Sequence, residues 1–426
     1  MRFEQALAEL DARQPEGKPK PDLDRIRDVL TLLDDPQLRF PTIHVTGTNG
    51  KTTTARLATA LACAHGLATG LYTSPHLLSV TERMSVCGSA IGEEEFAEEY
   101  ERLLPFLRTI DERLGGVTYF EALTALALLW FADKPVDLGV IEVGMGGTWD
   151  ATNLVAGDVA VLCPVGLDHP ELGSTVAEIA TEKAGIIKPG KIAVVREQVP
   201  EALAVFTARC EDYEVPLLLE GRDWSVDART AMGGQALSIH GTHGTYDEVL
   251  LSLFGGFAAR NAGAAVVALE AFLDRALEED AVRDALGTAT SPGRVEVVGR
   301  RPLVVLDGAH NPAAAAALAA TLPEVFTWDR LHLVMAAFAD KDAAGVAAAL
   351  APLADRAYAA ANGNPRSRTP DEMAAILAEA GIAGERFDSV AEALAAARAS
   401  AGDGDLILVT GSLYTVADAR RALGGP

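Results

Sequence analysis

The stretch IHVTGTNGKTTT, residues 43–54, combines the parts of a phosphate-binding loop. An apolar run leads into Gly47 and Gly50, and Lys51 and three threonines follow them. Glycines between a strand and a helix leave backbone N–H groups free to face a phosphate, and the helix N-terminus adds a favourable dipole. The common pattern G-x-x-x-x-G-K-[ST] needs a glycine where this sequence has Val45. We therefore predict a shorter phosphate loop, and the alternative is an ordinary tight turn with a solvated lysine.

Other residues of the same stretch fit nucleotide chemistry. Lys51 is long enough to reach phosphate oxygens, and Thr52 or Thr53 offers a hydroxyl that suits Mg²⁺. The segment Ala55–His65 that follows has a helical composition and stops at Gly66. A strand, a glycine loop and a helix in this order predict a nucleotide site in an α/β domain.

The bulk composition limits the class of protein. The chain has 426 residues, which exceeds one ordinary domain and favours two or three. Its 60 Asp and Glu residues outnumber 36 Lys and Arg residues, so the formal charge is −24. An acidic surface repels nucleic acids and anionic membranes, so we expect neither as a partner. The sequence contains no run of about 18 uncharged apolar residues and no apolar signal core near its start, which predicts a soluble cytoplasmic protein.

The four cysteines are Cys63, Cys87, Cys163 and Cys210. They are scattered without a C-x-x-C pair, and each lies in or beside an apolar stretch. This spacing argues against a zinc site and favours structural free thiols in a reducing cytosol.

Short apolar runs alternate with Ala- and Leu-rich helical patterns, which predicts parallel sheets covered by helices. In the first half, strands are expected at Thr42–Thr46, Gly70–Thr73, Leu138–Val143, Val159–Pro164 and Lys191–Arg196. Glycines and short alternating pieces near 215–255 predict a small antiparallel insertion, and a helix at Asn261–Phe272 is expected after it.

The α/β alternation restarts after the turn-rich segment TATSPG, residues 288–293. Strands are expected there at Leu303–Leu306, Leu331–Met335, Arg356–Ala361 and Leu406–Thr410. We therefore predict an N-terminal parallel-sheet domain of the phosphate-loop type at 1–291, with the insertion inside it. A smaller Rossmann-like α/β domain is predicted at 292–426, with a cleft between the two.

Four candidate strands end in polar residues that suit a ligand site. The first leads to Lys51 and Thr52, and the others lead to Ser74, Glu142 and His169. Ligands of open α/β sheets bind at the carboxyl ends of the strands, so these residues would converge if the strands are neighbours. Each residue alone also has a structural interpretation: Ser74 as a helix cap, Glu142 as a salt-bridged core residue and His169 as a packing residue.

Glu142 is the most informative of these residues, because a carboxylate inside an apolar strand is costly unless it is paired or bound to metal. The glycines Gly144, Gly146 and Gly147 follow it and allow the backbone to approach a ligand closely. Since Mg²⁺ prefers a few carboxylates together with phosphates and waters, we predict that Glu142 is a Mg²⁺ ligand.

Taken in order, the motifs resemble the folylpolyglutamate synthase/dihydrofolate synthase family within the ATP-dependent Mur ligase superfamily. The matching segments span nearly the whole chain: TGTNGKTT (46–53), TSPHL (73–77), ERM (82–84), TYFEA (118–122), EVGMGG (142–147), DATN (150–153), GLDH (166–169), AEIATEKAGIIKPG (177–190), RNA (260–262), GRVE (293–296), LDGAHNP (306–312) and TGSLY (410–414). The short G-x-x-G-K-T loop is the form that this superfamily uses.

The resemblance implies a set of site residues. Those around ATP would be Gly47, Thr48, Asn49, Gly50, Lys51, Thr52, Thr53, Asn261, Arg294, Asp307 and His310. Those near the pterin-bearing substrate would be Arg83, Thr118, Phe120, Glu121, Asp150 and Ala151. The Mg²⁺ ligands would be Thr52, Ser74, Glu142 and His169, and the catalytic residues Lys51, Lys183 and His310. Lys183, otherwise readable as a solvated helical lysine, matches the lysine that is carbamylated in the family.

The sequence also departs from the family pattern. Thr148 stands where the family usually has an arginine before DATN. Phe257 and Ala258 replace a His-Gln pair expected shortly before Asn261, and the segment after GLDH is one residue shorter than usual. Thr52 stands where many folate-specific members have glycine, a variation that also occurs within the family.

The resemblance implies an ATP-dependent carboxylate–amine ligase. ATP would phosphorylate a folate-type carboxylate, that of dihydropteroate or of a tetrahydrofolate polyglutamate, and the amine of L-glutamate would attack the acyl phosphate. ADP and phosphate would leave, with ATP and Mg²⁺ as cofactors and the protein as a monomer. The alternatives are a Mur-superfamily ligase for another carboxylate and amino acid, and a nucleotide-binding module without ligase activity.

Overall fold

The computed structural model describes residues 1–15, 22–167 and 170–424. The chain divides into two compact units, and each is described by itself. The first holds Met1–Arg229, Ala236–Ser252 and Ala258–Ala289. The second holds Thr290–Pro426 and the short segments Thr230–Gln235 and Leu253–Phe257.

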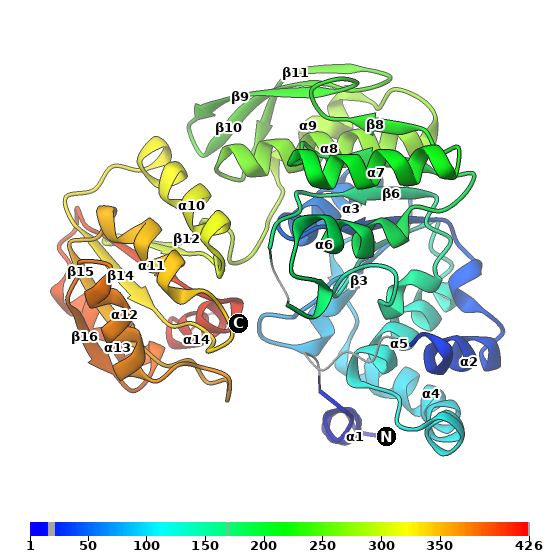
Figure 1. The fold of residues 1–426 in the computed structure, drawn as a ribbon, viewed down its shortest axis with the longest axis horizontal. Coiled ribbons are helices and arrows are strands. Elements are labelled where there is room, and N and C mark those ends of the chain that lie inside the picture. The colour runs from blue at the N-terminus through cyan, green and yellow to red at the C-terminus, as the bar shows by residue number, and fades with distance from the viewer. Residues whose placement is uncertain (16–21, 168–169, 425–426) are drawn as a thin grey trace. The chain divides into compact units, whose positions relative to one another are not determined.

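The first unit is built on a mixed sheet (Figure 1). In the described part of the chain its strand order is β4-β3-β2-β5-β1-β6-β7-β8. From β2 to β8 all neighbours are parallel, whereas β3 and β4 add an antiparallel edge. The strands are β1 (Thr42–Thr46), β2 (Thr69–Tyr72), β3 (Met84–Val86), β4 (Ser89–Ala90), β5 (Leu138–Glu142), β6 (Val159–Leu162), β7 (Ile192–Val195) and β8 (Leu217–Leu219).

The first unit also contains helices, several of which cover this sheet. They are α1 (Phe3–Asp11), α2 (Asp24–Leu32), α3 (Lys51–Ala64), α4 (Glu93–Leu114), α5 (Tyr119–Asp133), α6 (Val176–Lys183), α7 (Pro200–Asp212), α8 (Gly256–Leu273) and α9 (Glu279–Gly287). Helices α1, α2, α4 and α5 share a hydrophobic cluster with Tyr72 and Ile141 of the sheet. Helices α6 and α7 form a second cluster with Ala160 and Leu162. Helix α3 lies against β1, β2, β5 and α9.

Strand register decides which polar side chain faces which helix. Parallel pairing aligns Val45 with Glu142 across β1 and β5, and it places His44 beside Ile141 in the preceding row. Successive side chains of a strand point to opposite faces of the sheet. Because Ile141 packs toward α5, Glu142 must point to the other face, where α3 begins at Lys51.

The predicted insertion contains a separate three-stranded sheet of β9 (Ser225–Ala231), β10 (Gly234–His240) and β11 (Thr245–Leu251), in the order β11-β10-β9. Only Met232 and Gly233 connect β9 to β10, and antiparallel neighbours alone can use so short a turn. The range predicted for the insertion begins too early, because β8 at Leu217–Leu219 pairs with β7 in the main sheet. The helix predicted from Asn261 begins earlier, at Gly256.

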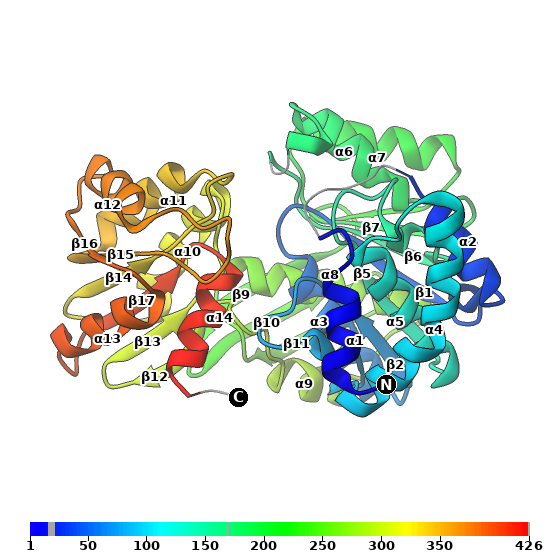
Figure 2. The ribbon, with the colours of Figure 1, turned by 90° about the horizontal axis from the view of Figure 1, so that it is seen from below.

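The second unit has its own sheet, with the strand order β12-β13-β17-β14-β15-β16 among the described residues. Its strands are β12 (Glu296–Arg300), β13 (Leu303–Leu306), β14 (Leu331–Met335), β15 (Arg356–Ala360), β16 (Gly384–Phe387) and β17 (Leu406–Thr410). Its helices are α10 (Pro312–Val325), α11 (Ala343–Leu350), α12 (Pro370–Glu379), α13 (Val390–Ser400) and α14 (Leu413–Ala422). Figure 2 shows α11 and α12 on one face of this sheet and α13 and α14 on the other. The predicted α/β fold class with two parallel-sheet parts is therefore confirmed.

The prediction of free thiols is wrong for two of the four cysteines. Cys63 near the end of α3 and Cys87 in the turn between β3 and β4 form a disulfide, with a Cα–Cα distance of 5.7 Å. Cys163 and Cys210 are free and buried. The paired cysteines lie 24 residues apart on different elements, so only the tertiary fold brings them together.

Helix α8 is apolar throughout most of its length. Among the helices that the structure describes, it alone is long and apolar enough to cross a membrane by these two criteria. However, 72% of its 18 residues are buried inside the protein, as in the central helix of a globular domain.

Candidate active site

The phosphate loop turns tightly against the chain that follows β6. Gly47 has a φ of +149°, and a Cβ built on it would lie 2.5 Å from Cβ of Cys163. Gly50 precedes α3 with a φ of +94°, a conformation that favours glycine. The backbone N–H of Thr48 donates to the carbonyl of Pro164 at 2.9 Å. These contacts fix the loop at the N-terminus of the 14-residue helix α3. A loop in this position can bind phosphate through its backbone N–H groups.

Two lysines converge on this loop from different helices. Lys51 at the start of α3 donates from Nζ to the carbonyl of Gly47 at 2.9 Å. Lys183 at the end of α6 is only 2% exposed and donates to the same carbonyl at 3.0 Å. A buried lysine that reaches the loop is not a solvated surface residue, so the structure excludes that interpretation of Lys183.

Glu142 lies at the end of β5 and is 1% exposed. Its Oε1 accepts a hydrogen bond from Thr52 Oγ1 at 2.7 Å, and its Oε2 accepts one from the backbone N–H of Ser74 at 3.2 Å. Three neighbouring strand ends, those of β1, β5 and β2, therefore meet as the register predicts. Ser74 is not a helix cap, because the following 3-10 helix (Val80–Arg83) is capped by Ser79.

The donor set around Glu142 suits Mg²⁺, which takes oxygen ligands and retains waters and phosphates. Thr52 and Glu142 supply a hydroxyl and a carboxylate at one point. Among residues 1–15, 22–167 and 170–424, no group of three or more His, Cys, Asp and Glu side chains could hold a metal ion. The predicted ligand His169 lies outside the described residues.

The glycine loop after β5 packs on the end of α6. A Cβ on Gly147 would lie 2.7 Å from the carbonyl oxygen of Glu182, so a side chain has no room there. Thr148 donates from Oγ1 to that carbonyl at 3.0 Å and from its backbone N–H at 2.9 Å. Thr148, where the resemblance predicts an arginine, thus anchors the loop to the end of α6, which carries Lys183.

The TYFEA segment begins α5, and its polar residues have structural partners. Thr118 caps the helix, and its backbone N–H donates to Glu121 Oε2 at 2.7 Å. Arg25 of α2 donates to both carboxylate oxygens of Glu121, at 2.9 and 3.2 Å. Phe120 lies over Gly144, where a Cβ would come within 2.5 Å of the ring. The ring of Phe120 and the loop that follows Glu142 are therefore in direct contact.

Buried hydrogen bonds fix the side chain of Asp150. It accepts hydrogen bonds from Thr152 Oγ1 at 2.5 Å and from the backbone N–H of Met145 at 2.9 Å. His44 of β1 lies 2.8 Å from the same threonine hydroxyl. Burial holds the pKa of His44 well below its ordinary value, and the nearby charge of Lys188 lowers it further. Burial also raises the pKa of Asp150, although hydrogen bonds from Thr152 and Met145 oppose this. Ala151 is the next residue and is buried.

Arg83 is the other predicted substrate residue of this unit, and it is only 2% exposed. Its Nε donates to His76 Nδ1 at 2.9 Å, and its guanidinium lies 5.5 Å from the ring centroid of Tyr119. It therefore connects the segment after β2 with the start of α5.

Lys188 fixes the segment that contains DATN. Its Nζ donates to the backbone carbonyls of Asn153, at 2.9 Å, and Val155. Burial lowers the pKa of Lys188 to about 8 from 10.5. Sequence inspection did not identify this role, because nothing in the IIKPG pattern distinguishes a buried lysine from an exposed one.

We expect this depressed pKa to appear in the pH dependence of stability. Between pH 8 and 10.5 the unfolded chain keeps a proton on Lys188 that the folded chain has lost, so folding becomes more favourable as the pH rises. Across that range, wild-type protein should gain about 3 kcal/mol of unfolding free energy relative to Lys188→Met. Urea unfolding at several pH values measures this difference, and a difference independent of pH would contradict it.

The second unit groups three of the predicted ATP contacts. Asp307 follows β13 and accepts hydrogen bonds from the backbone N–H groups of Val295 and Ala309, both at 2.8 Å. Burial raises the pKa of Asp307, and the charge of Arg294 opposes this shift. His310 Nδ1 donates to the carbonyl of Gly308 at 3.0 Å.

Asn261 on α8 is the remaining predicted ATP contact, and it lies beside the phosphate loop. Its side chain accepts a hydrogen bond from Arg196, a residue that the sequence did not single out. Phe257, at one of the positions that depart from the family pattern, packs against the hydrophobic core of the second unit. Phe257 therefore has a packing role in this chain.

Models of two protein domains together match most of the chain. The Mur ligase middle domain matches residues 45–269, and the Mur ligase glutamate ligase domain matches 293–413. The chain is 39% identical to the dihydrofolate synthase/folylpolyglutamate synthase of Mycobacterium tuberculosis, over 97% of this chain and 92% of that protein.

Solved structures resemble the chain along its whole length. The folylpolyglutamate synthase of Mycobacterium tuberculosis complexed with ADP superposes with a TM-score of 0.96 at 37% identity, covering 100% of this chain and 98% of that one. A folylpolyglutamate synthase complex with AMPPCP and folate has a TM-score of 0.88 at 31% identity and full coverage of both chains. The chain therefore belongs to the folylpolyglutamate synthase/dihydrofolate synthase family of Mur ligases and is an ATP-dependent ligase.

Proposed function

We propose that this ligase joins L-glutamate to the carboxylate of a folate-type substrate at the strand-end site of the first unit. The meeting of Lys51, Thr52, Glu142 and Lys183 at the phosphate loop carries the proposal. Phe120 belongs to the segment that we propose to contact the pterin, and its contact with the loop after Glu142 supports this proposal. A relative that has been solved with AMPPCP and folate together supports the same pairing of ligands.

In the proposed reaction the substrate carboxylate attacks the γ-phosphate of ATP and forms an acyl phosphate, and ADP leaves. Lys51 and the N–H groups at the start of α3 would hold the phosphates and neutralise developing charge. Thr52, Glu142, Ser74 and His169 would hold Mg²⁺, which would supply positive charge to neutralise the phosphates. Arg294, Asp307 and Asn261 would position the nucleotide.

The second step needs the uncharged amine of L-glutamate. This amine attacks the acyl carbon, the tetrahedral intermediate collapses, and phosphate leaves as the amide forms. His310 would accept the amine's proton as the general base of this step. The acyl phosphate also reacts with water, so a site that excludes water during this step protects it.

We also propose that Lys183 is carbamylated in the working enzyme. Lys51 and Lys183 both bond the carbonyl of Gly47, so two cations would crowd one acceptor. A carbamate on Lys183 would remove this repulsion and would supply an anion near the residues proposed to hold Mg²⁺. Intact-mass measurement in bicarbonate buffer should show the addition of one CO₂, which Lys183→Arg should lack. An unmodified, fully active enzyme would contradict the proposal.

A substrate panel tests the proposed function. ADP formation should depend on dihydropteroate or tetrahydrofolate together with L-glutamate, and mass spectrometry should show a glutamylated product. A UDP-linked muramyl substrate with several amino acids is the matched comparison, because other Mur ligases use such carboxylates. Turnover with the muramyl compound alone would overturn the folate assignment. ATP binding without any carboxylate-stimulated ADP formation would favour a non-catalytic nucleotide module.

Three further properties belong to the same proposal: a monomeric state, a cytoplasmic location and the absence of nucleic-acid and membrane partners. The formal charge of −24 supports the last of these, because it disfavours polyanionic surfaces. Sedimentation of the purified chain measures the monomeric state.

A further inference from the structure

The side chain of Asn261 lies directly over the phosphate loop. Asn261 is 2% exposed, and a Cβ on Gly50 would lie 2.8 Å from its Oδ1 and 3.2 Å from its Nδ2. Gly50 is the residue from which α3 begins, so the carboxamide of Asn261 borders the place where phosphate N–H donors are concentrated. A carboxamide at this place can present either an acceptor or a donor, depending on which way it is turned.

Arg196 decides that orientation. It follows β7, is 3% exposed, and donates from Nη1 to Oδ1 of Asn261. A guanidinium has only donors, so the atom that faces it must be the carboxamide oxygen. The amide nitrogen of Asn261 is then the atom left to face a ligand at the loop. Without Arg196, both orientations of the carboxamide would become accessible.

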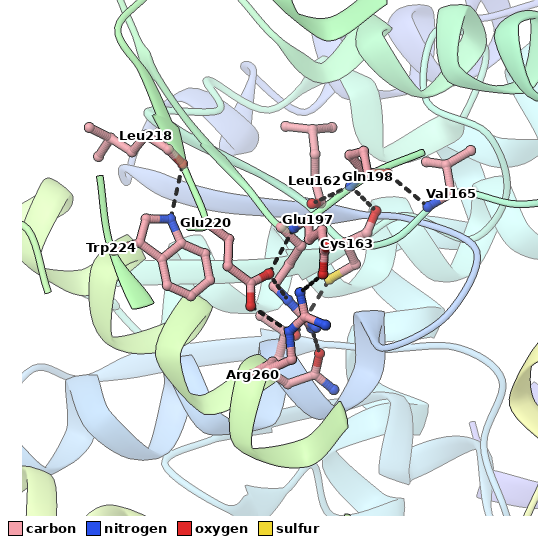
Figure 3. A network of polar contacts seen from close by, with 12 residues as sticks. Leu162, Cys163, Val165, Glu197, Gln198, Leu218, Glu220, Trp224 and Arg260 are labelled. Carbon is pink, nitrogen blue, oxygen red and sulfur yellow. Dashed lines mark hydrogen bonds and ion pairs between the residues drawn. The ribbon is translucent and has the colours of Figure 1, made fainter. Parts of the chain in front are cut away.

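Arg196 is itself fixed by a buried ion pair. Its Nε donates to Oε2 of Glu220 at 2.9 Å, and the two side chains are 3% and 7% exposed. Arg260 donates to the other oxygen of Glu220 and also to Glu197. Burial raises the pKa of Glu220, but the hydrogen bonds and charges of Arg260 and Arg196 outweigh this and leave the pKa lowered. Figure 3 shows Glu220 bonded to Arg260. Glu220 therefore remains a carboxylate, and it orients the guanidinium of Arg196.

We propose that Arg196 is a positioning residue that, through its bond to Oδ1 of Asn261, turns the amide nitrogen of Asn261 toward bound nucleotide. This inference rests on the proposed role of the phosphate loop in binding ATP. Arg196 acts on nucleotide affinity only through Asn261, and Glu220 acts through Arg196. Its role differs from that of Lys51, whose side chain belongs to the loop's own helix.

A double-mutant cycle tests the proposal, with the dissociation constant of ADP measured by calorimetry on the full chain. Arg196→Met should weaken ADP binding about tenfold, because a hydrogen bond that orients a buried polar group is lost. Asn261→Ala should weaken it at least as much. The double variant should bind no more weakly than Asn261→Ala, since Arg196 then has nothing to orient. In steady-state assays, the KM for ATP should rise while kcat changes less.

Arg260→Met is the matched control. It removes the other arginine from Glu220, but the described hydrogen bonds of Arg260 go to Glu220 and Glu197 rather than to Asn261. It should lower the unfolding temperature yet leave the ADP dissociation constant within about twofold. Glu220→Gln serves as a second probe of Arg196 if Arg196→Met does not fold. It should weaken ADP binding in the presence of Asn261 and have no effect in the Asn261→Ala background.

The outcomes separate this inference from the proposed function. If Arg196→Met binds ADP as wild type does, or if its effect adds fully to that of Asn261→Ala, the positioning role of Arg196 is overturned while the ligase assignment stands. If wild-type protein itself fails to bind ADP, the nucleotide site at the phosphate loop is overturned, and the positioning role falls with it.

Discussion

Lys51→Ala should lower ADP formation by about three orders of magnitude with every carboxylate substrate, because it removes the cation placed to neutralise the transferred phosphate. Lys51 Nζ lies 2.9 Å from the carbonyl of Gly47, at the point where α3 begins. The side chain is only half-buried, so its removal should leave the fold intact. A coupled ADP assay measures the rate, and thermal unfolding measures the stability.

Lys191→Ala is the control for this variant. Lys191 lies on the same unit and pairs with Asp158 at 2.7 Å, away from the phosphate loop. Its loss should leave turnover near the wild-type rate, since a partly exposed ion pair contributes little to stability. Near-normal turnover of Lys51→Ala would refute the phosphate role of the loop, whereas an unfolded Lys51→Ala would show that Lys51 also supports the turn.

Much of the fold was predictable because the buried strands are short, continuous apolar runs. Leu406–Thr410, with four apolar residues in a row, is buried at every position, and its predicted bounds coincide with those of β17. The antiparallel edge of β3 and β4 was missed, because β4 has only two residues and both are exposed. The disulfide between Cys63 and Cys87 was missed for a different reason. It depends on α3 and that edge lying side by side, which no local pattern encodes.

The candidate site was predictable where strand register dictates it. Lys51, Ser74 and Glu142 follow neighbouring parallel strands, so the carboxyl ends of those strands had to bring them together. The supporting residues could not be found in this way. Arg196 meets Asn261 across 65 residues, and Arg25 meets Glu121 across 96. Such contacts depend on how distant elements pack, and a charged residue outside an apolar strand carries no sequence signal that it will be buried.

Glu142→Gln should lower the rate of ADP formation by about a thousandfold and raise the Mg²⁺ concentration needed for half-maximal activity by more than about tenfold. The carboxylate now accepts from Thr52 at 2.7 Å and from the N–H of Ser74 at 3.2 Å. A glutamine keeps the shape but loses the charge that attracts the metal. The NH₂ group of the glutamine would also face either the hydroxyl of Thr52 or the N–H of Ser74, and a donor cannot accept that hydrogen bond. The contact between the strand ends is then weaker.

Glu270→Gln separates this metal-linked effect from the general cost of altering a buried glutamate. Glu270 on α8 is completely buried and accepts from Tyr246 Oη at 2.7 Å and from the N–H of Thr242 at 2.7 Å. Its replacement should lower stability, because a buried donor loses its acceptor, but the Mg²⁺ dependence of ADP formation should not change. If Glu142→Gln behaves in the same way, with lower stability and an unaltered Mg²⁺ dependence, then Glu142 is a structural residue and the metal is held elsewhere.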